Sequence, residues 1–227
     1  MPLPSGLTPP RPLGTPPKEG KTQTMKEAFD FLTNQESIFK QIVLEYGLPS
    51  IPSRPQGFET LVLLILEQQV SIDSAKATYL RLRDKAISFT PERLVVFSEE
   101  EFRSMGVSRQ KANYIKGLSQ VIINNEIHLE SLSQKTAVEV REELIKIKGI
   151  GNWTIDVYLM FSLQAADVFP IGDVAVVNTM RELFNIHSKE EMLLLAEKWS
   201  PYRSHATFLL WHHYLNKRNR KISYNYE

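Results

Sequence analysis

Apolar residues along the chain follow the spacing of α-helices rather than the alternation of β-strands. From about residue 24 to residue 217, apolar positions recur roughly every three or four residues, and Ser, Thr, Gly or Pro separate the segments. Residues 58–66 are almost wholly apolar but too short to span a bilayer, which predicts a buried core helix. No persuasive strand and no long internal repeat interrupts the pattern. The sequence therefore predicts an all-α fold. Further helices are expected over residues 73–84, 91–96, 99–105, 108–124, 136–147, 188–199 and 202–217.

The helix over residues 136–147 is joined by a very short connection to another helix, which is predicted from the apolar spacing of Ile155, Tyr158, Leu159, Phe161 and Leu163. Thr136 and Glu139 have the spacing of a capping box, which predicts that the first helix begins there. The connection is Gly149-Ile150-Gly151, in which the glycines permit a tight turn and the isoleucine fills the gap between the helices. The segment is predicted to form a helix-hairpin-helix.

The N–H groups of this turn lie at the start of the second helix. Free donors and the positive end of the helix dipole favour a phosphate oxygen at such a place. Lys146 and Lys148 flank the turn and add positive charge. Two interpretations are open on the turn alone, an ordinary helical connection or a clamp for a nucleic-acid backbone. A clamp of this kind holds phosphates without reading the base sequence.

A second motif follows the hairpin, at Pro170-Ile-Gly172-Asp173. A Pro/Gly loop before an apolar run predicts that Asp173 lies at a helix N-terminus, where it serves as an N-cap residue, as a functional carboxylate, or as both. The hairpin and this loop together resemble the helix-hairpin-helix (HhH-GPD) DNA glycosylase superfamily, whose signature ends in a catalytic aspartate. The resemblance implies that Asp173 is catalytic and that the fold has two helical lobes with a DNA cleft between them.

The residue at position 153 indicates which class of glycosylase within the superfamily the chain resembles. Bifunctional members of the superfamily carry an attacking lysine two residues after the second hairpin glycine, and this chain has Trp153 there. An indole N–H cannot form a Schiff base. The resemblance therefore implies a monofunctional glycosylase in which water attacks the sugar.

Two further stretches look like the DNA-3-methyladenine glycosylase II family, Glu67 to Ser71 and Ala196 to Ser204. In that family the first stretch meets the DNA minor groove, so the resemblance implies DNA contacts for Gln68, Gln69 and Ser71. Many relatives carry an apolar wedge at the position of Gln69. A glutamine there would fill the space left by the extruded nucleotide and also contact the unpaired base.

The resemblance also implies a pocket for the extruded base. Trp211 matches a pocket tryptophan of the family, Trp153 is the second pocket residue, and Tyr158 and Tyr202 are further candidates. Without the resemblance, Trp211 would be interpreted as a core residue of an apolar helix. The two histidines after Trp211 point in different directions on a helix and lack companion ligands at metal spacing, so no metal site is predicted.

Composition and charge limit the chemistry. The chain contains no cysteine, which excludes disulfides, a thiolate nucleophile, cysteine-ligated zinc and the iron–sulfur cluster of some relatives. No cofactor is expected. Because the formal net charge is only +1, a DNA-binding surface must come from local groups of basic residues. Such groups occur at Lys146 and Lys148, at Arg103, Arg109 and Lys111, and at Lys217, Arg218, Arg220 and Lys221.

The chain is expected to have one folded domain between two tails. Residues 1–22 are rich in proline and predicted to be disordered, and they have no apolar segment typical of a signal peptide. Too few residues precede the core helix for the N-terminal β domain of some relatives. The expected divisions are a glycosylase domain over residues 23–217, one lobe over 58–170, the other lobe over 23–57 and 171–217, and a basic tail over 218–227.

The expected function is excision of alkylated purines, of the 3-methyladenine and 7-methylguanine type, from double-stranded DNA. A positive charge on such a base weakens its bond to the sugar, and a tryptophan face attracts the cation. Two alternatives stay open, a glycosylase for deaminated or mismatched bases and a non-enzymatic DNA-binding protein. We expect a monomer that does not bind membranes, located in the cytoplasm at the nucleoid of a bacterium or in a eukaryotic nucleus.

Overall fold

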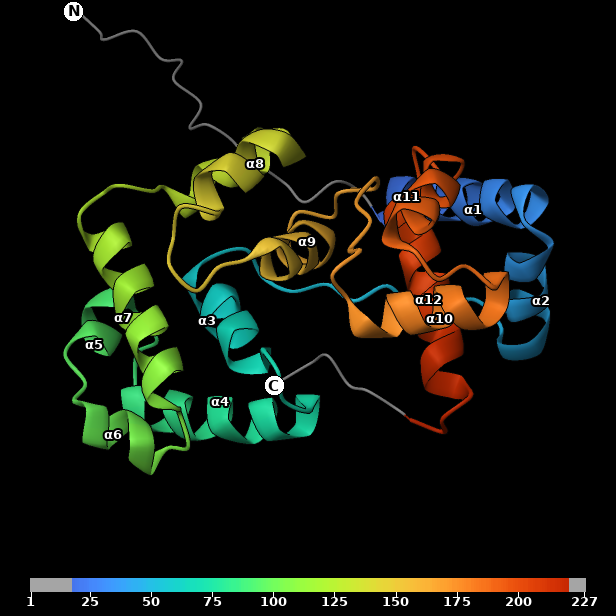
Figure 1. Cartoon of the computed structure of the whole chain (residues 1–227). Coiled ribbons are helices and arrows are strands. Elements are labelled where there is room, and N and C mark those ends of the chain that lie inside the picture. The colour runs from blue at the N-terminus through green and yellow to red at the C-terminus, as the bar shows by residue number, and fades with distance from the viewer. Residues whose placement is uncertain (1–17, 221–227) are drawn as a thin grey trace, which may run out of the picture.

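The structure of the chain, a computed structural model, describes residues 18–220 as helices joined by short connections (Figure 1). These residues contain no strand, which confirms the all-α prediction. None of the described helices is long and apolar enough to cross a membrane. The helices are α1 (Lys18–Gln35), α2 (Ser37–Tyr46), α3 (Phe58–Glu67), α4 (Ile72–Ala86), α5 (Pro91–Val95), α6 (Glu99–Ser104), α7 (Arg109–Ile123), the 3-10 helix η1 (Leu129–Gln134), α8 (Ala137–Leu144), α9 (Asn152–Phe161), α10 (Val174–Phe184), α11 (Lys189–Glu197) and α12 (Arg203–Asn216).

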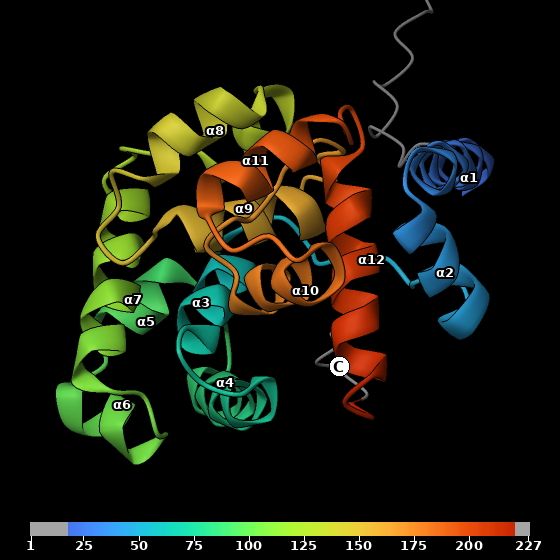
Figure 2. The ribbon, with the colours of Figure 1, turned by 45° about the vertical axis from the view of Figure 1, so that its right-hand side comes forward.

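Two hydrophobic cores hold these helices together. The first core is centred on α3, in which every residue from Thr60 to Glu67 is buried, and it includes residues of α4 to α9. The second core surrounds the fully buried Trp199 and joins α1 and α2 to α10, α11 and α12. Helices from the two ends of the chain thus share a core, since α1 and α2 pack against α12 (Figure 2). The exact domain boundaries stay a prediction.

The two cores meet along α9, α12 and the extended connection before α3. Figure 1 shows α9 between the group formed by α3 to α8 and the group that contains α10 to α12. Ile51 of the connection and Trp211 of α12 pack against both cores. Trp211 is therefore a core residue at the junction of the lobes, as helical spacing alone suggests, and its second role appears below.

Local signals in the sequence place several helix starts correctly. The capping box of Thr136 and Glu139 is present at the start of α8, with hydrogen bonds in both directions. The helix ends at Leu144, before the expected residue 147, and residues 145–148 form the turn that leads into Gly149. Because α8 is short, residues 145–151 are left to make the tight connection to α9.

The first helix begins earlier than expected. Helix α1 starts at Lys18, so residues 18–22 are helical and do not belong to a disordered tail. The proline-rich stretch ends at Pro17, and the residues after it contain no proline that would exclude a helix. Residues 1–17 and 221–227, where the rest of the expected tails falls, lie outside the described residues.

Candidate active site

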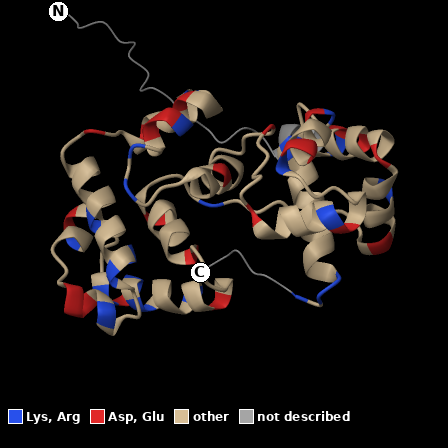
Figure 3. Cartoon of the chain, viewed as in Figure 1, with Lys and Arg blue, Asp and Glu red and all other residues tan. Residues whose placement is uncertain are grey.

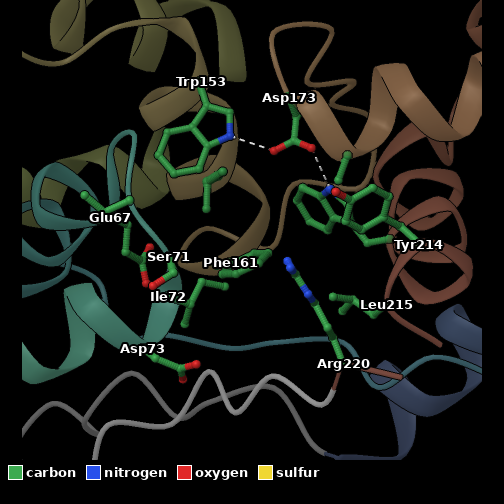
Figure 4. A pocket seen from close by; sticks show the side chains of 14 residues that line it. Glu67, Ser71, Ile72, Asp73, Trp153, Phe161, Asp173, Tyr214, Leu215 and Arg220 are labelled. Carbon is green, nitrogen blue, oxygen red and sulfur yellow. Dashed lines mark hydrogen bonds between the residues drawn. The ribbon is translucent and has the colours of Figure 1, made fainter. Parts of the chain in front are cut away.

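Asp173 lies at the start of α10, where its carboxylate accepts three N–H hydrogen bonds. Its Oδ1 accepts from the backbone N–H of Val176 at 3.0 Å and from the indole Nε1 of Trp211 at 3.0 Å. Its Oδ2 accepts from the indole Nε1 of Trp153 at 2.8 Å. Dashed lines mark the two indole bonds in Figure 4. Because both oxygens are bonded, the carboxylate is held in one orientation.

The three donors belong to three different helices. Trp153 is the second residue of α9 and follows the hairpin turn, Trp211 lies within α12, and Val176 is in the first turn of α10. The bond from Val176 confirms that Asp173 is an N-cap residue. The catalytic role implied by the resemblance stays a prediction. A structural role and a chemical role are compatible here, because the same carboxylate also faces a cavity.

This cavity has a volume of about 490 Å³, which is in the range of small-molecule binding pockets. It is enclosed by the α3–α4 turn, α9, α10 and α12, so both lobes contribute to it. Its apolar and charged side chains are interspersed (Figure 4). The lining residues are Glu67, Val70, Ser71, Ile72, Asp73, Trp153, Val157, Phe161, Asp173, Ala175, Trp211, Tyr214, Leu215 and Arg220.

The two predicted pocket tyrosines do not line this cavity, which corrects their assignment. Tyr158 is fully buried in the first core, and its hydroxyl accepts a hydrogen bond from the backbone N–H of Gly57 at 3.1 Å. Burial raises the pKa of Tyr158 to about 12. Tyr202 packs edge-on against Phe31 in the second core. Tyr158 faces the first core because it lies on the inner face of α9, whereas Tyr202 is the N-cap residue of α12 and packs its ring beside the second core.

Several lining residues were missed from the sequence. Phe161 lies eight residues after Trp153, so it shares its helix face, and Tyr214 follows Trp211 by one helical turn. Helical spacing from the two tryptophans was the signal that could have found them. Glu67 gave no such signal, because nothing in the sequence shows which way the last residue of a core helix points.

The α3–α4 turn contains the predicted minor-groove residues, and they have different roles. The side-chain amide of Gln68 donates to the carbonyl oxygen of Gly149 at 2.8 Å and to Oγ1 of Thr154 at 3.0 Å. Gln68 thus joins the turn to the hairpin while it lines the groove, and its contact with DNA stays a prediction. Gln69 is exposed with φ of +58°, and its role at DNA stays a prediction. Ser71 caps α4 and lines the cavity.

The hairpin has the expected tight geometry. Ile150 is 2% exposed and packs in the first core between the helices, as predicted. Gly149 has φ of +95°, and a Cβ there would overlap the ring of Tyr114. A Cβ on Gly151 would meet no atom within 4 Å, so this residue borders open space. The N-terminus of α9 has no side-chain cap, which leaves its N–H groups available to an anion.

A groove of about 890 Å³ extends from the hairpin to Asp173. Lys148 and Lys111 line it, and Lys146 is exposed beside it. The ammonium group of Lys111 donates to the carbonyl oxygen of Leu66 at 2.7 Å, and burial lowers the pKa of this lysine. Figure 3 shows Lys and Arg spread over both groups of helices rather than on one element. The positive charge at the groove therefore comes from a few nearby lysines, which agrees with the expectation from a net charge of only +1.

A metal site is not apparent in the part of the chain that the structure describes. Residues 18–220 contain no group of three His, Cys, Asp or Glu side chains that could hold a metal ion. The buried His213 that follows the cavity tryptophan instead contacts the carboxylate of Glu182 at 2.9 Å. This histidine therefore joins α12 to α10.

The arrangement can be compared with known proteins. A family model described as "HhH-GPD superfamily base excision DNA repair protein" matches residues 62–202, a range that contains both the hairpin and Asp173. The chain belongs to this HhH-GPD family. The family is one of DNA glycosylases that act in base excision repair.

Individual HhH-GPD relatives cover much of the chain. It is 30% identical over 181 residues to the DNA-3-methyladenine glycosylase of Bacillus subtilis, spanning 73% of this chain but 59% of that relative. It is 30% identical to DNA-3-methyladenine glycosylase 1 of Schizosaccharomyces pombe, spanning 70% of this chain and 72% of the relative. The structure of 3-methyladenine DNA glycosylase Mag1 of S. pombe with abasic DNA matches with a TM-score of 0.75 at 28% identity, covering 82% and 95% of the two chains.

Substitution of the two hairpin glycines by alanine should separate folding from DNA binding. Gly149→Ala should lower the free energy of unfolding by about 1–3 kcal/mol, because the new Cβ overlaps Tyr114 and the φ is positive. Gly151→Ala should change stability by less than about 0.5 kcal/mol and weaken binding to damaged and undamaged duplexes equally. Urea denaturation and fluorescence anisotropy measure the two effects. Unchanged DNA affinity in Gly151→Ala would argue against a close backbone approach at the hairpin.

Trp153→Phe tests the indole bond to Asp173. The substitution keeps an aromatic ring in the cavity but removes one N–H donor from a charged acceptor. We expect the single-turnover rate of base release to fall roughly 10- to 100-fold, because a hydrogen bond to a charged group contributes about 1.5–3 kcal/mol. Tyr214→Phe is the control, since Tyr214 lines the same cavity and is not a donor to Asp173. Similar losses in both variants would mean that only cavity shape matters.

Proposed function

We propose that this protein is a monofunctional DNA N-glycosylase that removes alkylated purines of the 3-methyladenine and 7-methylguanine type. The observation that carries the proposal is the carboxylate of Asp173, held by three N–H groups at the wall of a base-sized cavity that opens next to the hairpin groove. The names of the relatives support the same substrate class. The expected partner is damaged double-stranded DNA, bound by a monomer, in the bacterial cytoplasm or the eukaryotic nucleus.

In this reaction the groove binds the DNA duplex and the cavity binds the extruded base. The N–H groups of the α9 N-terminus and Lys148 hold phosphates of the duplex beside the α3–α4 turn. The damaged nucleotide leaves the stack, Gln69 occupies the vacated space, and the base enters the cavity between Trp153 and Trp211. Extrusion costs a few kcal/mol, least for a damaged base. The phosphate grip supplies part of the binding energy for this step.

Asp173 then acts on the sugar. The bond between C1′ and the base nitrogen breaks with its electron pair leaving on the base, which neutralises the positive charge of an alkylated purine. The sugar becomes an oxocarbenium-like cation, and the fixed carboxylate of Asp173 stabilises that charge. Water attacks C1′ and transfers a proton to Asp173 or to solvent. The products are a free base and an intact abasic strand.

Lyase activity is not part of the proposal. Trp153 occupies the position of the lysine in bifunctional relatives, and its N–H is bonded to Asp173. Lys111 also lines the groove, and burial lowers its pKa. Its ammonium group, however, donates a hydrogen bond to the carbonyl oxygen of Leu66 in α3. A covalent sugar adduct is therefore not expected at either position.

Asp173→Asn tests the catalytic assignment. Loss of this charge should reduce release of 3-methyladenine and 7-methylguanine from alkylated DNA by at least about 100-fold, and binding to a duplex with an abasic-site analogue should persist. Chromatography of released bases and anisotropy measure the two effects. If the wild-type protein binds DNA but releases no base from a panel of alkylated, deaminated and mismatched substrates, the enzyme proposal fails. Release of deaminated bases alone would contradict only the substrate class.

Borohydride reduction tests the absence of lyase chemistry. We expect the wild-type protein to release the base without forming a covalent protein–DNA adduct, because no lysine stands at the position of Trp153. A bifunctional glycosylase on its own substrate is the positive control for trapping. A trapped adduct that disappears in Lys111→Met would identify a lysine nucleophile and contradict the monofunctional assignment.

A further inference from the structure

Glu67 contributes a buried negative charge to the wall of the cavity. It is the last residue of α3, is only 9% exposed, and lines both the cavity and the groove. Figure 4 shows it beside Ser71, on the side of the α3–α4 turn. The alkylated-purine mechanism above gives this carboxylate no role, because Asp173 is the group placed to act on the sugar.

A guanidinium group behind the cavity wall fixes this carboxylate. Arg54 donates from Nη1 to Oε2 of Glu67 at 2.9 Å and from Nη2 to Oε1 at 2.7 Å. Arg54 is 5% exposed, lies over the ring of Phe161 at 5.3 Å, and is not among the residues that line the cavity. The ion pair is therefore oriented, with its negative end toward the cavity and its positive end in the core.

Folding alone does not account for this placement. The C-terminal end of a helix disfavours a negative charge, and a buried ion pair is often no more stabilising than apolar side chains of the same volume. A salt bridge that only tied the extended connection to α3 would not need its carboxylate at the cavity wall. The location of Glu67 calls for an interaction with whatever enters the cavity.

The other charges around the cavity point to the kind of base that it accepts. Three carboxylates, those of Glu67, Asp73 and Asp173, line it against one guanidinium, that of Arg220. An acidic lining repels phosphates, so it does not serve to grip the DNA backbone. Because a buried carboxylate attracts a cation that replaces lost solvent, the lining suits a positively charged base.

We propose that Glu67 is a specificity-determining residue that selects positively charged bases as they enter the cavity. This inference rests on the proposed function and names the residue responsible for lesion choice. The base loses its positive charge when the sugar bond breaks. Glu67 therefore stabilises the extruded base more than the transition state, and it acts on capture of the lesion rather than on bond cleavage.

Binding of two matched duplexes tests the proposal. One contains 7-methylguanine on a 2′-fluorinated sugar that resists cleavage, and the other contains neutral 7-methyl-7-deazaguanine, which has the same shape. The wild-type protein should prefer the cationic duplex, and Glu67→Gln should reduce the ratio of the two affinities about tenfold, which corresponds to about 1.4 kcal/mol. The maximal single-turnover rate on ordinary 7-methylguanine should not fall in Glu67→Gln, because the extruded base loses more stabilisation than the transition state does.

Three further variants separate charge selection from structural damage. Since Glu67→Gln leaves the guanidinium of Arg54 buried without a negative partner at this position, the double variant Arg54→Gln/Glu67→Gln repeats the test with no charge at either residue. Glu67→Asp keeps the charge and should keep the preference. Asp156→Asn is the matched control, because Asp156 is 5% exposed, is paired with Arg141 at 2.5 Å and lies outside the cavity lining. Thermal unfolding monitors the fold of each variant.

The outcomes distinguish this inference from the proposed function. A reduced preference in Glu67→Gln and in the double variant, with a normal preference in Glu67→Asp and Asp156→Asn, supports the inference. An unchanged preference, or an equal loss of affinity for both duplexes, overturns it while excision of methylated purines by the wild-type protein keeps the proposed function. If the wild-type protein releases no methylated purine, the proposed function fails and the inference fails with it.

Discussion

The hydrogen bonds to the carboxylate of Asp173 are the interaction on which the arrangement of the site depends. One oxygen is held from α10 and α12 and the other from α9, so a single side chain fixes the relative position of three helices. Trp211 also packs against both hydrophobic cores. A shift of either lobe would move a donor away from the carboxylate. Asp173, the proposed catalytic residue, thus also connects helices of both lobes in the tertiary structure.

The charges of the molecule are divided between two tasks. Lys148 and the free N–H groups of α9 face the groove, where a DNA backbone would lie, while Glu67 and Asp73 face the cavity, where a base would lie. Positive charge suits phosphates, and negative charge suits a cationic base. In the proposed function, attraction to DNA and selection of the lesion use charges of opposite sign at two adjoining places.

The α3–α4 turn couples these two regions. The side chain of Gln68 connects the turn to the hairpin by hydrogen bonds. Lys111 of α7 donates a hydrogen bond to the carbonyl oxygen of Leu66, near the C-terminal end of α3. Glu67 and Gln69, on either side of Gln68, are thereby positioned relative to the phosphate-binding turn. In the proposed function, a duplex held at the hairpin would meet Gln69 and the cavity mouth in a defined register. In the proposed function, this fixed register lets the contacts to phosphates direct one nucleotide toward Asp173.

Most helices, the hairpin, the buried position of Ile150 and the N-cap position of Asp173 could be predicted from the amino-acid sequence, because periodicity, caps and glycine turns are local properties of the chain. The sequence also singled out Trp153 and Trp211, but not that both indoles bond to one carboxylate. The packing of the helices was needed to show that Tyr158 faces a core, that Gln68 donates hydrogen bonds to the hairpin and α9, and that Glu67 faces the cavity. These outcomes depend on which helices pack together, and contacts between distant segments leave no local pattern in the sequence.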